Sequence, residues 1–448
     1  MRFKTQTHVF DADSLNLKSM YVRLQTLLGE AFFCEQAEAQ YTFLGAGSSQ
    51  LLYLEKSVLY QIDHVRKHIN RSHVSPETLA DACQQFLQTV EIDTPLDKNS
   101  LDLPLLAWWG YHRLGIAEIP DFQYQIYRYN FVFDWETALL YCTEFVPLEA
   151  EFSADLIQSW VYTPATAPKK FAPVGGFSPL LSEQAQYEQV RALYQACRTG
   201  VVYEAQAANV WELPYQGDSV WAYYRAACKQ APHLYSFFAK YADAELFGFG
   251  DSSPFRYNQG NLFAELSAYT QPHTPTQYAQ NLEMLTQIAA TENTRTAHWL
   301  GLESILSNLS QYAQEAHIEQ VLTPIFSDKT ARLSSNIRAH LPNTPNFSAW
   351  ATLHAQFPAP SQVGVPVQSG MQLSPNNPVL SWGFVDVSNQ FAQMLACSNL
   401  GFALPCNTLK VAHYQPITRF LNKANLQHEQ QQTSQTQAQI LENFTQLG

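Results

Sequence analysis

The chain has 448 residues, of which 46% are hydrophobic and 15% charged, and its 26 basic against 39 acidic residues give a formal net charge of −13. So much apolar sequence can bury a large core, which excludes an intrinsically disordered chain. The acidic balance excludes nucleic acid as an expected partner, because phosphates require a basic surface. The one locally basic stretch, residues 64–68 with Arg71, is interpreted as a solvated helix face.

Helical and strand patterns alternate through residues 1–163, which we predict to form an N-terminal region. Apolar residues at helical spacing predict a helix over 14–28. Aromatic and aliphatic runs predict strands at 31–34, 50–54, 103–111 and 122–135. Residues 164–180 are rich in proline, glycine and alanine, and we predict that they are a linker.

Residues 181–426 are predicted to form a second region, followed by a glutamine-rich tail over 427–448. Its first helix is expected over 182–200, where apolar side chains share one face before Gly200. A helix-to-strand unit is expected over 220–250. Helices are expected over 277–318 and 347–357, and strands over 366–404.

The sequence predicts a cytoplasmic protein with no membrane partner. No apolar segment follows the charged start as in a secretory signal, and no apolar run approaches the ~20 residues that span a bilayer. The seven cysteines are odd in number and scattered, without a CxxC pair, which disfavours a disulfide framework or a zinc site. Phosphate-loop, dinucleotide, zinc-protease and nucleophile-elbow motifs are also missing from the sequence.

One stretch near the C-terminus resembles a family signature. Residues 357–371 keep Phe357, Pro358, Ser361, Gly364, Pro366 and Met371 in the register of FPGGSITGAPK…AM. This is the signature of the chorismate-utilising enzymes, which include component I of anthranilate synthase and of aminodeoxychorismate synthase. Further segments resemble other family blocks in the family's order, and they lie at 41–45, 103–111, 187–204, 232–254 and 332–341. The segment at 103–111 makes aminodeoxychorismate synthase component I the nearest match.

The resemblance implies an α+β fold, a layered sandwich with large antiparallel sheets, outer helices and two intertwined subdomains. It also implies a cleft between the two halves, where Mg²⁺ bridges a carboxylate of chorismate. Such chemistry needs carboxylates for the hard Mg²⁺ ion, cations for the substrate carboxylates and a general acid for the departing hydroxyl.

Several positions that carry charge in the family are neutral or changed here. Gln280 stands where the family has a metal-binding glutamate, and Phe255 stands where SSPE has its glutamate. Arg332 replaces the histidine of HLVS, and Val367 replaces the lysine of GAPK. No glutamate occurs between Glu319 and Glu429, although the family's later metal ligands align near residues 416–419. We therefore predict no bound cofactor, although the resemblance implies Mg²⁺, and we assign no catalytic or metal-binding residue.

The remaining ligand-binding candidates are Ser335, Arg332, Ser361, Gly364 and Pro366. The guanidinium of Arg332 could pair with an anionic ligand, and the two serines could bind a carboxylate. Each candidate also has a purely structural alternative. Arg332 could form a surface salt bridge, the serines could make turn-stabilising hydrogen bonds, and Gly364 and Pro366 could fix the conformation of the loop.

Two functions are compatible with this pattern, and a third remains open. The first is a component I-like enzyme that aminates chorismate toward 4-aminobenzoate and folate, with ammonia from a glutamine amidotransferase subunit, and with doubtful catalytic competence. The second is a non-catalytic binding, regulatory or partner-docking module on the same scaffold. A different, metal-free reaction in the same cleft is the third. The sequence leaves open a small aromatic-pathway acid such as chorismate as the ligand and a glutamine amidotransferase subunit as a protein partner.

Overall fold

The computed structural model describes most of the chain, namely residues 2–13, 15–36, 41–75, 78–79, 81–83, 85, 90–93, 105–114, 120, 122–163, 170–198, 204–230, 233–242, 244–250, 252–309, 313–326, 330–341, 371–373, 379–386, 391–396, 399–404 and 407–418.

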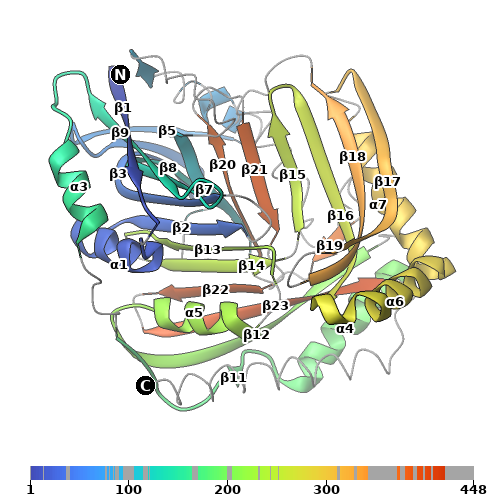
Figure 1. Ribbon diagram of the computed structural model, residues 1–448. Helices are drawn as coiled ribbons and strands as arrows, with labels where there is room; N and C mark the ends of the chain where they lie inside the picture. The colour runs from blue at the N-terminus through green and yellow to red at the C-terminus, as the bar shows by residue number, and fades with distance from the viewer. Residues whose placement is uncertain are drawn as a thin grey trace.

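Two long neighbouring strands, β3 (Tyr41–Glu55) and β8 (Phe122–Asp134), pair with each other and connect the two sheets of the fold (Figure 1). The first part of β3 pairs with β2 (Ala31–Gln36), and its last part pairs with β4 (Val58–Asp63). Strand β8 is divided in the same way between β7 (Ala107–Leu114) and β9 (Leu139–Pro147). The β3–β8 pair therefore belongs to two sheets that diverge from it.

The first sheet runs in the order β6, β1, β9, β8, β3, β2, β13, β14, β22, β23, β12, and β10, β11 and β19 add to β12. All of these pairings are antiparallel except β1–β6 and β12–β19. The strands not yet bounded are β1 (Arg2–Asp11), β6 (Glu91–Ile92), β10 (Phe171–Pro173), β11 (Ser178–Pro179), β12 (Glu204–Gly217), β13 (Tyr235–Lys240), β14 (Glu245–Gly250), β19 (Met371–Leu373), β22 (Asn399–Leu404) and β23 (Thr408–Thr418).

The second sheet is antiparallel throughout and runs in the order β5, β4, β3, β8, β7, β20, β21, β15, β16, β18, β17. Its remaining strands are β5 (His68–His73), β15 (Ser252–Asn258), β16 (Asn261–Pro272), β17 (Glu315–Phe326), β18 (Thr330–His340), β20 (Val379–Asp386) and β21 (Phe391–Ala396).

Both sheets combine strands from early and late parts of the sequence. Strand β13 pairs with β2 in the first sheet, and β20 pairs with β7 in the second. This confirms the predicted α+β layered sandwich with two intertwined subdomains. The boundaries at 163, 180 and 426 stay predictions; the described part of the expected linker contributes β10 and β11 to the first sheet, and the tail lies outside the described residues.

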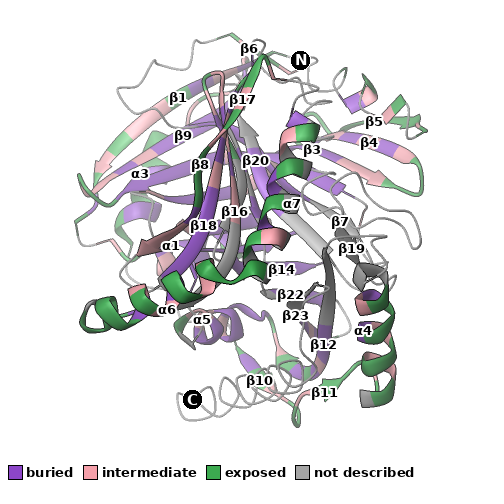
Figure 2. Cartoon of the chain, turned by 90° about the vertical axis from the view of Figure 1, so that its right-hand side faces the viewer, coloured by how far each residue is buried: buried purple, intermediate pink, exposed green. Residues whose placement is uncertain are grey.

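The helices lie on the outer faces of the sheets. Helices α6 and α7 contact β16–β18 of the second sheet, and α4 contacts β12 and β23 of the first. The solvent-facing sides of α4, α6 and α7 are largely exposed (Figure 2). The helices in chain order are α1 (Leu17–Leu28), α3 (Ala154–Tyr162), α4 (Glu183–Arg198), α5 (Trp221–Gln230), the 3₁₀ turn η1 (Pro275–Gln277), α6 (Tyr278–Ala290) and α7 (Glu292–Leu309).

Most of the helices expected from periodicity are found. The expectation over 14–28 corresponds to α1, that over 182–200 to α4, and the unit over 220–250 to α5, β13 and β14. The expected helical stretch over 277–318 is wrong at its end, because the chain leaves α7 at Leu309 and forms β17 from Glu315. The helix expected over 347–357 lies outside the described residues.

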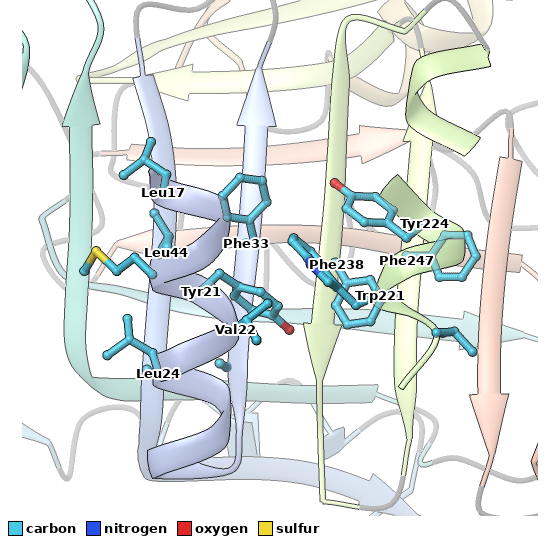
Figure 3. Packing of buried hydrophobic residues seen from close by; sticks show 14 of the residues in the cluster. Leu17, Tyr21, Val22, Leu24, Phe33, Leu44, Trp221, Tyr224, Phe238 and Phe247 are labelled. Carbon is cyan, nitrogen blue, oxygen red and sulfur yellow. The ribbon is translucent and has the colours of Figure 1, made fainter. Parts of the chain in front are cut away.

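Aromatic side chains fill the layer between α1, α5 and the first sheet (Figure 3). The rings of Tyr21 on α1 and Trp221 on α5 lie 4.4 Å apart between centroids, and Phe33 of β2 meets Trp221 edge-on. Burying such large rings contributes a major part of the hydrophobic free energy of folding. This packing fixes β2 and β13, whose ends reach the candidate site.

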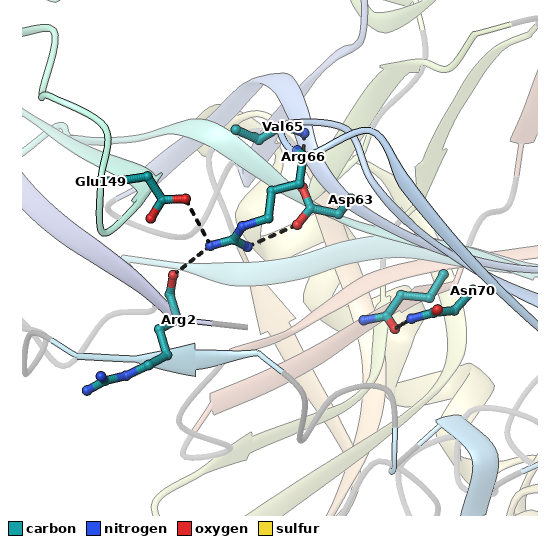
Figure 4. Close-up of polar contacts among 7 residues, drawn as sticks. Arg2, Asp63, Val65, Arg66, Asn70 and Glu149 are labelled. Atoms are coloured by element: carbon teal, nitrogen blue, oxygen red, sulfur yellow. Dashed lines mark hydrogen bonds and ion pairs between the residues drawn. The ribbon is translucent and has the colours of Figure 1, made fainter.

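The basic stretch at 64–68 is exposed, as expected, but it is not a helix. It forms the turn between β4 and β5, in which Asp63 Oδ1 accepts hydrogen bonds from the backbone N–H groups of Val65 and Arg66 (Figure 4). The Arg66 guanidinium lies 3.1 Å from the Asp63 carboxylate and 3.6 Å from that of Glu149. An aspartate that holds a turn in this way explains why the charged residues do not continue as a helix.

Candidate functional site

A cavity of about 350 Å³ lies where the ends of β2 and β13 meet the second sheet. Figure 1 shows the end of β2 directed toward β21 and β15. This size is within the range of small-molecule sites. The lining side chains are Gln36, Leu234 and Tyr235 from the first-sheet side, and Arg256, Phe263, Ala264, Glu265, Glu319, Arg332, Asn336 and Gln393 from the second sheet.

A buried ion pair lies at the side of this cavity. The Nε atom of Arg332 on β18 is 3.0 Å from Oε1 of Glu265 on β16, and the Ser334 hydroxyl donates to the same carboxylate oxygen at 2.8 Å. Arg332 and Ser334 lie on the same face of β18, because side chains alternate along a strand. Arg332 is 6% exposed, so the cost of burying its charge is offset by the carboxylate beside it.

A second arginine of the cavity has no acidic partner among the described residues. Arg256 on β15 is exposed, and its guanidinium carbon lies 5.4 Å from the centre of the Phe263 ring. Arg338 lies 5.2 Å from the same ring, but it is also paired with Glu319 at 3.4 Å. Within the described part of the chain, no carboxylate lies within ion-pair distance of Arg256. The cation–π contact with Phe263 therefore orients the Arg256 guanidinium, whose charge is available to an anionic ligand.

Neutral polar groups complete the cavity. Gln36 Nε2 at the end of β2 donates to Gln393 Oε1 on β21 at 2.8 Å, which connects the two sheets directly. Asn336 Nδ2 on β18 donates to Gln320 Oε1 at 3.3 Å. These amides offer donors and acceptors without net charge.

Ser335, the neighbour of these residues in sequence, points to the other side of β18. Its Oγ accepts a hydrogen bond from the Leu322 N–H at 2.7 Å and contacts Nε2 of His298 on α7. Burial lowers the pKa of His298 to about 4, because a charged imidazolium would lose its hydration. We assign a neutral ring whose Nε2 accepts a hydrogen bond from the Ser335 hydroxyl. This hydroxyl already accepts a hydrogen bond from the Leu322 N–H, so its own proton can point to His298.

The lowered pKa of His298 makes stability depend on pH. The unfolded histidine has a pKa near 6.5 and binds a proton before the folded one, so acidification from pH 6.5 to 4 favours unfolding. We expect this group to remove up to about 3 kcal/mol of stability over that range. Denaturant unfolding between pH 4 and 7.5 should show a weaker pH dependence for His298→Gln, whereas the exposed-site variant His340→Gln should follow the wild type. If the free energy of unfolding changes with pH equally in His298→Gln and the wild type, the assignment of a neutral His298 is wrong.

The structure thus brings one of the five ligand-binding candidates to the cavity. Arg332 lines it, Ser335 faces the helices instead, and Ser361, Gly364 and Pro366 lie outside the described residues. The lining residues Gln36, Arg256, Glu265 and Gln393 were not singled out from the sequence. A signal existed for Glu265, because a charged residue among apolar neighbours on a strand indicates a polar face.

The described side chains do not fit the oxygen-rich set that Mg²⁺ requires. No cluster of three or more His, Cys, Asp or Glu suited to a metal occurs among the described residues. Gln280 is exposed on α6 and does not line the cavity, and Glu265 already pairs with Arg332. The residues aligned with the family's C-terminal metal helix include Pro416–Thr418 of β23, which is a strand here.

Comparison with known proteins decides the family. The sequence profile described as "chorismate binding enzyme" matches residues 43–373, which is more than half of the chain. The chain belongs to this family. The resemblance inferred from the signature at 357–371 is thereby confirmed. A search of curated proteins finds no match.

Solved structures show the same fold at low sequence identity. MenF, the menaquinone-specific isochorismate synthase from Escherichia coli, is 13% identical, with a TM-score of 0.67 over 98% of this chain and 94% of MenF. Anthranilate synthase component I from Streptococcus pneumoniae TIGR4 is also 13% identical, with a TM-score of 0.63 over 91% of each chain. In the described part of this family member, no helix is long and apolar enough to span a membrane.

Proposed function

We propose that this family member binds a small cyclic carboxylic acid in the cavity between its two sheets and does not convert chorismate. The Arg332–Glu265–Ser334 group carries the proposal. Arg332 aligns with the histidine of the family's HLVS segment, and here it forms a buried ion pair with Glu265. An arginine held by a carboxylate is always protonated and cannot exchange a proton near neutral pH, so it cannot act as a general acid or base.

The cavity retains what a binding site needs. Arg256 supplies a cation for a carboxylate, Phe263 and Tyr235 supply ring surfaces, and the amide bridge between Gln36 and Gln393 supplies neutral hydrogen-bonding groups. Small-molecule sites combine apolar and ring surfaces with placed polar groups, and this mostly polar cavity offers both.

A component I-like enzyme of the aminodeoxychorismate branch is the second candidate. It is favoured by the segment at 103–111, of which β7 forms a part, and by membership of the family. This function would require a glutamine amidotransferase subunit or free ammonia, together with Mg²⁺. It is disfavoured by the lack of acidic clusters in the described part of the cavity.

Turnover and binding assays on the full chain separate the two candidates. With chorismate, ammonium and Mg²⁺ at high protein concentration, we expect no product by liquid chromatography. Product whose formation is abolished in Arg332→Ala would reject the binding-only proposal and support the enzyme.

Calorimetric titration tests binding itself, with 4-hydroxybenzoate and chorismate as probes. We expect Arg256→Gln to weaken the binding of 4-hydroxybenzoate by about 10- to 100-fold, because a hydrogen bond to a charged group is lost. Arg295→Gln, on α7 and outside the cavity lining, should leave the affinity unchanged. If the wild type binds neither probe, or if Arg256→Gln binds 4-hydroxybenzoate as tightly as the wild type, the proposal is wrong.

A further inference from the structure

Among the described residues around the cavity, the charges are arranged in pairs with one additional cation. Arg332 is paired with Glu265, and Arg338 beside the cavity is paired with Glu319. Arg256 is the additional cation, and its guanidinium lies over the Phe263 ring. In the described part of the cavity, one positive charge is therefore uncompensated.

Glu265 occupies the position at which a ligand carboxylate would meet Arg332. Its Oε1 lies 3.0 Å from the guanidinium Nε and accepts a hydrogen bond from the Ser334 hydroxyl. A ligand carboxylate bound at this place would make the same two contacts. The side chain of Glu265 is 19% exposed, and that of Arg332 is 7% exposed. A second ligand carboxylate would have to displace Glu265 or lie beside it, and either arrangement places like charges together at low dielectric.

We propose that the cavity selects monocarboxylic over dicarboxylic ring acids, because Glu265 acts as a built-in carboxylate that forms an ion pair with Arg332. The inference rests on the proposed function, since it concerns the ligand of the same cavity. The ligand carboxylate pairs with Arg256, and its ring lies toward Phe263 and Tyr235. The Gln36–Gln393 bridge and Asn336 then match a neutral hydroxyl or amino substituent on the ring. A dianion such as chorismate is the poorer ligand.

A matched pair of probes tests this selectivity. 4-Hydroxybenzoate and terephthalate share a ring and differ in one para substituent, which is a neutral hydroxyl in the first and a second carboxylate in the second. Calorimetric titration of the full chain should give at least about tenfold tighter binding of 4-hydroxybenzoate. Equal or tighter binding of terephthalate would overturn the inference while leaving the binding function intact, whereas binding of neither probe would remove the binding function itself.

Glu265→Gln is the variant that should reverse the preference. The amide keeps the shape and can accept the Ser334 hydrogen bond, but it frees the Arg332 charge for a ligand. We expect terephthalate affinity to rise at least about tenfold and 4-hydroxybenzoate affinity to change less. An unchanged ratio of the two affinities in this variant would overturn the inference.

The double variant Glu265→Gln/Arg332→Gln is the matched control, and it also guards against misfolding of the single variant. It removes both charges of the pair and leaves Arg256 alone, so the preference for 4-hydroxybenzoate should persist. A preference for terephthalate in the double variant would show that Arg332 does not govern selectivity and would reject the inference. Circular dichroism spectra of each variant establish that the chain being titrated is folded.

Discussion

The Gly110→Ala variant should lose more than about 3 kcal/mol of folding stability. A Cβ atom at this position of β7 would lie 1.9 Å from the carbonyl oxygen of Gln123 and 2.7 Å from the Cα atom of Tyr124, both on β8. Backbone atoms cannot move aside as a flexible side chain does. Strand β7 would have to part from β8, and β8 is shared by both sheets.

Gly176→Ala is the matched control, because nothing lies within 4 Å of a Cβ atom at that position. Guanidinium unfolding followed by circular dichroism should leave its midpoint close to that of the wild type, whereas Gly110→Ala should unfold at much lower denaturant or fail to accumulate as folded protein. A Gly110→Ala midpoint within experimental error of the wild type would mean that β7 and β8 are not packed this closely.

The parts of the fold that follow from sequence are those with a strong periodic pattern. Helix α1 and strand β8 each have an apolar repeat that matches one secondary structure, so they were predicted almost to their ends. The first residues of β17, up to Ile318, were mistaken for helix, because β17 is a half-exposed edge strand in which Glu315, His317 and Glu319 interrupt the apolar residues. An edge strand of this kind is held by its partner β18 and not by its own pattern.

The candidate site was less predictable, since its side chains come from strands that are far apart in sequence. Gln36 and Gln393 are separated by more than 350 positions, and only the arrangement of the two sheets brings them to a 2.8 Å hydrogen bond. No local pattern carries that information. The opposite orientation of Arg332 and Ser335 was, by contrast, available from sequence. Residues an odd number of positions apart on a regular strand point to opposite faces, so our prediction that both bind a ligand conflicts with their sequence spacing on one strand.

Glu245→Ala should be the most destabilising of the charge-removing variants, with a loss of about 3–5 kcal/mol. Glu245 begins β14 and is 3% exposed. Its Oε2 accepts hydrogen bonds from the Ser219 hydroxyl at 2.9 Å and from the Val220 N–H at 2.7 Å, at the start of α5. Its Oε1 accepts from Gln25 Nε2 of α1 at 3.2 Å, so one carboxylate joins two helices to the sheet. Removing it leaves three buried donors without their acceptor and removes an anion from a helix N-terminus.

Glu245→Gln should be milder, at about 1–2 kcal/mol, because a neutral amide can keep most of these contacts. Its oxygen can face Ser219 and Val220, which places its NH₂ group toward Gln25. The Gln25 amide can then turn over, since its Oε1 is buried without a hydrogen-bond partner in the described structure and can accept that NH₂ group. Denaturant unfolding at pH 7 of the two variants, with the exposed-site variant Glu151→Ala as a control, checks this order. Equal losses for Glu245→Ala and Glu245→Gln would indicate that the charge of Glu245, and not its hydrogen bonds, secures α1 and α5 to the first sheet.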